Sequence, residues 1–348
     1  IVGLAASFLG GAIADRFGRK GVMVFSLLFT GVGWFFYRAA DTLPVFALLM
    51  VITGATTPLY RLTSDAMVAD LVPVKKRLDA YSILRMGNNL GVAIGPVLGG
   101  LLISVSYFVT FSVMGIGFIA IGLLAVLLVR ESRKRATGEE IQLENKDGGY
   151  SAILKDSVFM RVLSAYTLNR ICTSILWMML AAYTSQNYGL SESRYGFIPA
   201  TNALMVIFLQ LLVTRSVNRH RQPFAMAAGA LIYAISIFSV SFGSGFWWFW
   251  FCMVGATVGE MILVPTTTTF TSRLAPPAMR ARYMSLYTLT WSIGTGLGPL
   301  LAGFASDLFS PQAMWYAAGL AGFVAFLIFV QIARSDSGMV NRLAGERA

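Results

Sequence analysis

The sequence predicts an all-α polytopic membrane protein, and three observations carry that prediction. Apolar residues make up 56% of the 348-residue chain and charged residues only 12%, with a mean hydropathy of +0.69. Long apolar runs follow one another, each near the roughly 20 residues that cross a hydrocarbon core. Short basic connections separate these runs, so the net charge of +11 indicates a membrane orientation signal rather than nucleic-acid binding.

The apolar runs predict a series of membrane-spanning helices, preceded by the remnant of another helix at residues 1–14. The complete spans are expected at residues 21–38, 44–62, 80–104, 108–130, 159–185, 195–214, 223–242, 246–268, 283–305 and 313–333. Basic side chains gather in alternate connections, which predicts that those connections face the cytoplasm.

An internal repeat divides the chain into two halves. An offset of 203 residues aligns Gly95 and Pro96 with Gly298 and Pro299. The counterpart of the span at 159–185 would precede residue 1, so we expect the first helix and part of the second to be missing here. The expected domains are an N-terminal helical bundle at residues 1–130, a cytoplasmic linker at 131–155, a C-terminal bundle at 156–335 and a cytoplasmic tail at 336–348.

A glycine-rich charged stretch lies between the first two runs, with the spacing Gly11-x-x-x-Asp15-Arg16-x-Gly18-Arg19-Lys20. It resembles the signature loop between the second and third helices of the major facilitator superfamily. The resemblance implies the major facilitator fold, two pseudo-symmetric six-helix bundles that rock about a central site. It also implies a conformational latch formed by Asp15, Arg16, Gly18, Arg19 and Asp70, in which Arg19 pairs with Asp70.

A second motif puts small residues on one helix face, at Gly91, Gly95, Pro96, Gly99 and Gly100. Small residues at this spacing let a neighbouring helix approach closely, so helix packing alone can explain them. The spacing also resembles the fifth-helix motif of the superfamily's drug:proton antiporters. This resemblance favours export over import.

Ionisable residues inside a bilayer are costly and therefore indicate function. Glu260 is the one carboxylate deep in a predicted span, and we expect it to take up and release the coupling proton, because desolvation disfavours its charged form. A protonated glutamate that only bonds to a neighbouring helix is the alternative. Arg85, near Asn88 and Asn89, is expected either to tune the proton affinity of Glu260 or to contact substrate.

Met and aromatic side chains form a deformable apolar surface, which suits varied lipophilic substrates. The candidate substrate-binding residues are Trp177, Met178, Asn169, Arg170, Asn88 and Asn89. The alternatives are that these side chains face lipid or the bundle core and that Arg170 reaches the headgroups.

The function predicted from these features is proton-coupled secondary transport, with efflux of drugs or amphiphiles by alternating access. A metabolite:proton symporter of the same fold is the nearest alternative, and a non-transporting membrane receptor a further one. We expect a monomer in the cell inner membrane whose partners are a small-molecule substrate, protons and the lipid bilayer. No phosphate-binding loop, metal-ligand set or activated nucleophile is visible, so neither a cofactor, a metal nor an enzymatic activity is predicted.

Overall fold

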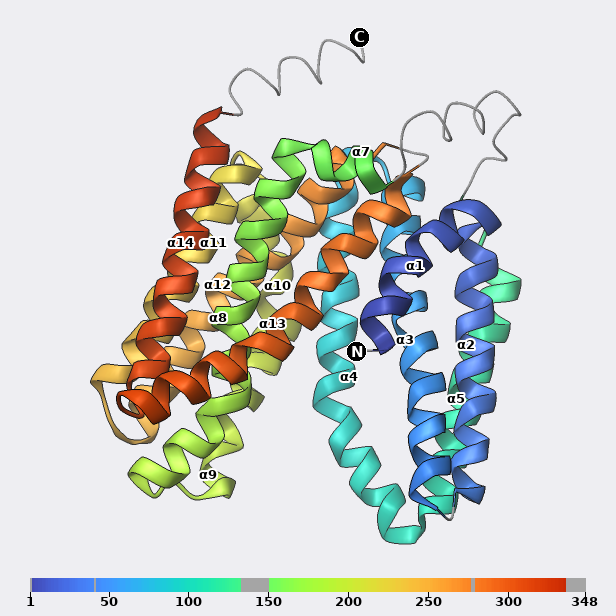
Figure 1. Ribbon diagram of the computed structural model, residues 1–348, viewed down its shortest axis with the longest axis horizontal. Coiled ribbons are helices and arrows are strands. Elements are labelled where there is room, and N and C mark those ends of the chain that lie inside the picture. The colour runs from blue at the N-terminus through green and yellow to red at the C-terminus, as the bar shows by residue number, and fades with distance from the viewer. Residues whose placement is uncertain (1, 41, 133–149, 277–278, 336–348) are drawn as a thin grey trace. The chain divides into compact units, whose positions relative to one another are not determined.

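The structure, a computed structural model, describes residues 2–40, 42–132, 150–276 and 279–335, and their regular elements are all helices (Figure 1). They form two compact units. Unit one comprises Ile1–Arg77, Gly91–Leu154 and Thr271–Leu289, and unit two comprises Leu78–Leu90, Lys155–Phe270 and Thr290–Ala348. The division into sequence halves stays a prediction. Much of the predicted linker, at 133–149, and the tail at 336–348 lie outside the described residues.

Unit one is built around α2. Its helices are α1 (Val2–Phe17), α2 (Arg19–Phe36), α3 (Leu43–Leu71), α5 (Tyr107–Leu128) and α7 (Tyr150–Lys155), with 3-10 turns at Tyr37–Ala39 and Val74–Lys76. Helix α2 packs against both α3 and α5, and α1 packs against α3 (Figure 1). The apolar side chains of Met23, Leu27 and Met67 form part of its buried core.

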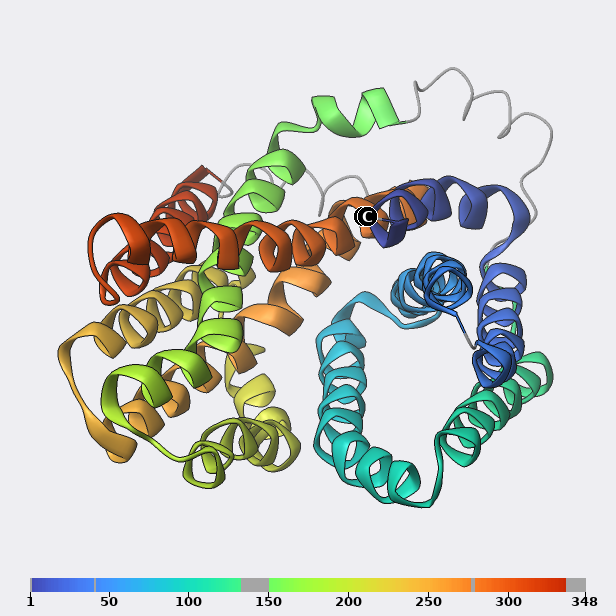
Figure 2. The ribbon, with the colours of Figure 1, turned by 60° about the horizontal axis from the view of Figure 1, so that its bottom comes forward.

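Unit two is built around α8, α11 and α14. Its helices are α8 (Ser157–Tyr188), α9 (Glu192–Tyr195), α10 (Phe197–Val217), α11 (Gln222–Ser239) and α14 (Ala313–Ser335), with a 3-10 turn at Val240–Phe242. Helix α14 packs against α11 and α8, as Figure 2 shows in red beside yellow and green. Three more helices, α4 (Arg77–Val105), α12 (Gly245–Leu274) and α13 (Arg280–Leu308), contribute residues to both units.

Local sequence signals set several helix ends. Ser106 precedes α5, and its hydroxyl accepts a hydrogen bond from the backbone N–H of Val109 at 3.0 Å. Asp156 precedes α8 in the same way and accepts from the N–H groups of Val158 and Phe159. Gly189 ends α8 with a φ of 64°, a left-handed conformation that favours glycine.

Six helices in the described part of the chain are long and apolar enough to cross a membrane: Leu43–Leu71, Tyr107–Leu128, Phe197–Val217, Gln222–Phe242, Gly245–Leu274 and Ala313–Ser335. All six overlap predicted spans. Several helices run past the predicted ends, because helical hydrogen bonding does not stop where the apolar residues do. The clearest case is α3, which was expected to end at residue 62 but continues to Leu71 and so carries Asp65 and Asp70.

Candidate functional site

The structure corrects the prediction of a loop at Gly11–Lys20, because this stretch is almost entirely helical. Helix α1 continues to Phe17 and α2 begins at Arg19, so Gly18 alone separates them. Gly18 has a φ of 94°, a backbone conformation open to glycine at no steric cost. The charges of this stretch are therefore held on two helices, in fixed directions.

Glu131 closes the corner made by Gly18. Its two carboxylate oxygens accept hydrogen bonds from the backbone N–H groups of Arg19 and Lys20, each at 3.1 Å. These are the first two residues of α2, whose amides have no partner within the helix. The negative charge also lies at the positive end of the α2 dipole, which stabilises it there.

Asp15 lies beyond the apolar part of α1, and its side chain is fully buried against the start of α13. Its carboxylate oxygens accept hydrogen bonds from the backbone N–H groups of Ala281 at 3.2 Å and Arg282 at 3.1 Å. Arg19 also donates to Asp15, at 3.4 Å. Burial raises the pKa of the Asp15 carboxyl to about 6, and the charge of Arg19 and the two amides only partly oppose that rise.

The carboxylate of Asp70 links three elements through hydrogen bonds and ion pairs. One of its oxygens accepts from the Arg280 guanidinium at 2.6 Å, and the other accepts from Ser132 Oγ at 2.8 Å and is paired with Arg19. Arg19 itself is 2% exposed, so its charge is compensated inside the protein by Asp15 and Asp70. We call Asp15, Arg19, Asp70, Arg280 and Arg282 the charged cluster. Within it, the structure brings together three of the five predicted latch residues.

The remaining predicted latch residues occupy different places. Gly18 forms the corner already described. Arg16 is exposed, with its guanidinium over the Phe17 ring at 5.6 Å.

An ion pair in unit two is mostly shielded from solvent, with side-chain exposures of 9% for Arg85 and 14% for Glu260. Arg85 on α4 contacts Glu260 on α12 at 2.7 Å between Nη2 and Oε1. Asn202 on α10 donates to the other carboxylate oxygen at 2.8 Å and to Thr257, one turn earlier on α12, at 3.0 Å. The guanidinium stabilises the ionised carboxylate and opposes the desolvation expected from the sequence.

Arg170 on α8 lies in the same unit, in an aromatic setting. Its guanidinium is 4.6 Å from the Tyr166 ring centroid and 5.1 Å from that of Trp291. It also donates to the Tyr166 hydroxyl. Cations over aromatic faces are stabilised by the ring quadrupole, so the two rings stabilise the position of Arg170 within the unit.

The other predicted substrate residues differ in how far they are exposed. Asn169 is 1% exposed, whereas the side chains of Trp177 and Met178 are 38% and 46% exposed. Asn88 is exposed, and Asn89 donates to the Arg85 carbonyl one turn earlier at 3.0 Å. A helix pattern gives spacing but does not identify the face that meets the partner, so the sequence could not separate these cases.

The two Gly-Pro motifs have different surroundings. A Cβ added to Gly91, Gly95 or Gly99 would meet nothing within 4 Å in the described part of the chain, so the predicted close approach is not made there. Side chains at Pro96 and Gly100 lie outside the described residues. In the repeat copy, a Cβ on Gly294 would lie 2.6 Å from Arg170 Cβ, so this copy does pack closely, against α8.

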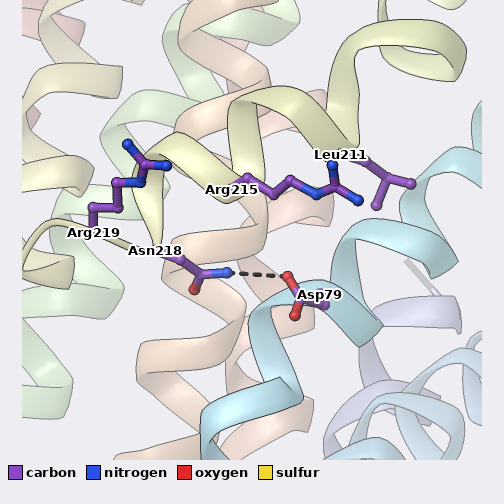
Figure 3. A pocket seen from close by; sticks show the side chains of 5 residues that line it. All are labelled: Asp79, Leu211, Arg215, Asn218 and Arg219. Atoms are coloured by element: carbon purple, nitrogen blue, oxygen red, sulfur yellow. Dashed lines mark hydrogen bonds between the residues drawn. The ribbon is translucent and has the colours of Figure 1, made fainter.

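A pocket of about 480 Å³ lies where the last turn of α10 meets the first turn of α4 (Figure 3). Its lining residues are Asp79, Leu211, Arg215, Asn218 and Arg219. Asn218 donates to Asp79 at 3.0 Å, the bond drawn in Figure 3. None of the predicted site residues lines this pocket.

Sequence reasoning missed several residues that contact the predicted latch residues. Glu131, Arg280 and Arg282 contact the latch residues across more than a hundred positions of sequence. The repeat offered one signal, since it aligns Arg77 with Arg280. For Glu131 the sequence carried no such signal.

Comparison with known proteins gives a consistent result. The family model described as Major Facilitator Superfamily matches residues 1–167 and again residues 162–343. A Na(+), Li(+), K(+)/H(+) antiporter of Planococcus maritimus is 27% identical over 348 residues, covering 92% of this chain and 80% of that protein. Multidrug resistance protein MdtH of Yersinia pestis (strain Pestoides F) is 26% identical over 322 residues, covering 90% and 78%.

Solved structures of similar fold are more distant in sequence. The human organic anion transporter MFSD10 (TETRAN) superposes with a TM-score of 0.78 at 19% identity, covering 94% of this chain and 82% of that one. The proton:xylose symporter XylE superposes with a TM-score of 0.77 at 15% identity, covering 95% and 83%. At these identities the likeness concerns the fold alone.

Proposed function

This chain belongs to the Major Facilitator Superfamily, and from that premise we propose that it is a proton-coupled secondary transporter working by alternating access. Members of this family are multi-pass membrane transporters and not enzymes, and they bind small substrates. We further propose the cell inner membrane as its location and a monomer as its working form.

The observation that carries the proton coupling is the largely shielded contact between Arg85 and Glu260. A carboxylate inside a membrane helix needs a partner while it is charged and none once it is protonated. The same group can therefore hold Arg85 when ionised and release it when neutral. An equilibrium of this kind lets a proton change the packing of α4 against α12.

Two directions of coupling have separate support. Efflux by antiport is our first candidate, because the Planococcus and Yersinia relatives carry the names of an antiporter and a multidrug resistance protein. The resemblance of Gly91, Gly95, Pro96, Gly99 and Gly100 to an antiporter motif agrees with it. Symport is the second candidate, favoured by the Arg85–Glu260 pair, since a substrate that takes over Arg85 leaves Glu260 to bind a proton.

The charged cluster has a mechanical role in this proposal. It holds the end of α1, with α3, against the start of α13, so we propose that it is a latch for one conformational state. Arg16 and Gly18 belong to the same proposal, with Gly18 setting the angle between α1 and α2. Substrate contact is proposed for Arg170 and Asn169, and for Trp177, Met178, Asn88 and Asn89 in a state that brings them closer.

The test uses the full chain in proteoliposomes with an imposed inward proton gradient, while lumenal pH is recorded as lipophilic compounds are added. Substrate-dependent proton movement should be lost in Glu260→Gln and retained in Asp307→Asn, a control for an exposed carboxylate in the same unit. Movement opposite to substrate means antiport, and movement with it means symport. Undiminished coupling in Glu260→Gln would refute the assigned proton site.

A further inference from the structure

We propose that the polar cluster around Glu260 binds the negatively charged group, a carboxylate or sulfonate, of an amphiphilic organic substrate. The cluster consists of Arg85, Arg170, Asn202, Tyr233 and Glu260, and we call it the donor cluster. This inference rests on the proposed transport function and adds the chemical class of the substrate.

The first argument is the balance of charge inside unit two. Among the described residues of its helices, Glu260 is the one carboxylate away from a helix end, since Asp79 and Asp307 both lie in terminal turns. Two guanidinium groups, Arg85 and Arg170, lie well inside their helices. An anionic group placed beside these two guanidinium groups would be stabilised by their positive charge.

The second argument is a surplus of hydrogen-bond donors. Both oxygens of Glu260 are engaged, one by Arg85 and the other by Asn202, and Asn202 gives its second contact to Thr257. Arg85 Nε and the Tyr233 hydroxyl are nevertheless buried without a hydrogen-bond acceptor among the described residues. These two residues are 8% and 1% exposed.

The surplus donors lie near the charges they would serve. Tyr233 lies against the residue that precedes Glu260, since a Cβ added to Gly259 would lie 2.9 Å from the backbone nitrogen of Tyr233. A buried donor left without an acceptor costs about 1–3 kcal/mol in general, so such groups are retained where a ligand supplies the acceptor. An anionic group accepts from several donors at once, whereas an ammonium group accepts from none.

The aromatic rings beside Arg170 form a surface that can contact the apolar part of an amphiphile. The guanidinium lies over the rings of Tyr166 and Trp291, and the Trp291 side chain is 49% exposed. A flat apolar body can stack on such a surface while its charged end reaches the guanidinium. The arrangement therefore fits an aromatic or lipophilic acid better than a small inorganic anion.

Anion binding at this cluster has a definite consequence for coupling. A negative charge beside Glu260 favours its protonated form, and by reciprocity a protonated Glu260 favours the anion. Substrate and proton then bind together, which is the coupling required by symport, the second candidate above. A cationic substrate would compete with the proton instead.

The test measures equilibrium binding to the purified full chain in a nonionic detergent, by quenching of intrinsic tryptophan fluorescence. Three probes share one ring system: 1-naphthalenesulfonate, the neutral 1-naphthalenemethanol and the cationic 1-naphthylmethylammonium. We expect saturable binding of the sulfonate, at least about tenfold tighter than either other probe. Acidification from pH 8 to pH 6 should tighten it.

Variants separate the cluster from general basicity. Arg170→Gln should weaken sulfonate binding at least about tenfold, and Tyr233→Phe by roughly three- to tenfold, because each removes a donor to the anion. Arg161→Gln, near the start of the same helix α8, is the matched control and should change nothing. Tyr233→Phe keeps the proposal testable should an arginine variant fail to fold.

The outcomes distinguish this inference from the transport function. Equal or tighter binding of the cation, or sulfonate binding unaffected by both Arg170→Gln and Tyr233→Phe, overturns the anion site even if proton-coupled transport is found. Selective sulfonate binding with no coupled proton movement supports the anion site and refutes the coupling.

Discussion

The charged cluster and its repeat counterpart make equivalent contacts in which the hydrogen-bond donor and acceptor are exchanged. At the end of α1, the carboxylate of Asp15 accepts from the first turn of α13. The repeat aligns Asp15 with Asn218 at the end of α10, and there the amide donates to Asp79 in the first turn of α4. The first contact is buried and the second is exposed, so only the first places an ionised group away from water.

The next turn of each helix repeats the contrast. Gly11 on α1 allows a close approach, because an added Cβ would lie 2.9 Å from Arg282 Cα. Its counterpart Thr214 on α10 instead shares a hydrogen bond of 2.7 Å with Ser82. Duplicated helices can thus keep one geometry while exchanging charge and close packing for neutral hydrogen bonds. Four experiments test this contrast.

The largest effect is expected from Arg19→Gln, which gives the first copy the residue found at the equivalent position, Gln222, of the second. Asp15 and Asp70 would lose a buried counter-charge, which costs about 3–5 kcal/mol of unfolding free energy. Thermal unfolding in detergent measures the loss. Gln222→Ala is the control and should cost under about 1 kcal/mol. Equal losses would mean that the two copies do not differ in this respect.

The pH dependence of stability should come from the first copy. Because the pKa of Asp15 is raised, the folded chain holds this proton more tightly than the unfolded chain does. The contribution of the protonated carboxyl to the free energy of unfolding is therefore complete below pH 3.8 and is lost as the pH rises through about 6. Relative to Asp15→Asn, the unvaried protein should lose roughly 3 kcal/mol between about pH 4 and pH 7. Unfolding of both proteins across this range measures the difference. Parallel curves for the unvaried protein and Asp15→Asn would contradict the assignment. The control Asn218→Ala should give a curve parallel to that of the unvaried protein.

The Gly-Pro motifs extend the comparison to packing. Gly294→Ala forces a Cβ to within 2.6 Å of Arg170 Cβ and 2.8 Å of its carbonyl oxygen, so α13 must shift from α8. Overpacking of this kind costs about 1–3 kcal/mol. Gly91→Ala meets open space and should be neutral or stabilising by up to about 1 kcal/mol, since alanine favours a helix. Melting temperatures of the two variants decide the point, and a cost at Gly91 equal to that at Gly294 would contradict it.

The smallest effect is expected from Asn218→Ala. It removes one exposed hydrogen bond to Asp79 and should cost less than about 1 kcal/mol. Thermal unfolding beside Thr214→Ala, which breaks the buried bond to Ser82, provides the scale. A larger loss for Asn218→Ala than for Thr214→Ala would mean that the exposed bond dominates this contact.

The sequence was informative where one residue type has one physical meaning. Apolar runs located the spans, and the rarity of charge in them singled out Glu260 and Arg85. Their contact follows from how α4 meets α12, which no local pattern encodes. The stretch at Gly11–Lys20 looked like a loop because its glycines and charges end an apolar run, yet only Gly18 leaves the helix. Glu131 could not be foreseen, since its role depends on where a distant helix begins.

Gly18 limits which amino-acid substitutions this part of the chain can accept in evolution. Its φ of 94° excludes most side chains, and an added Cβ would also lie 2.8 Å from an oxygen of Glu131. A replacement must therefore solve two problems together, a strained backbone and a displaced carboxylate that caps α2. Single substitutions at position 18 are therefore selected against, and the corner can change only through paired substitutions at positions 18 and 131.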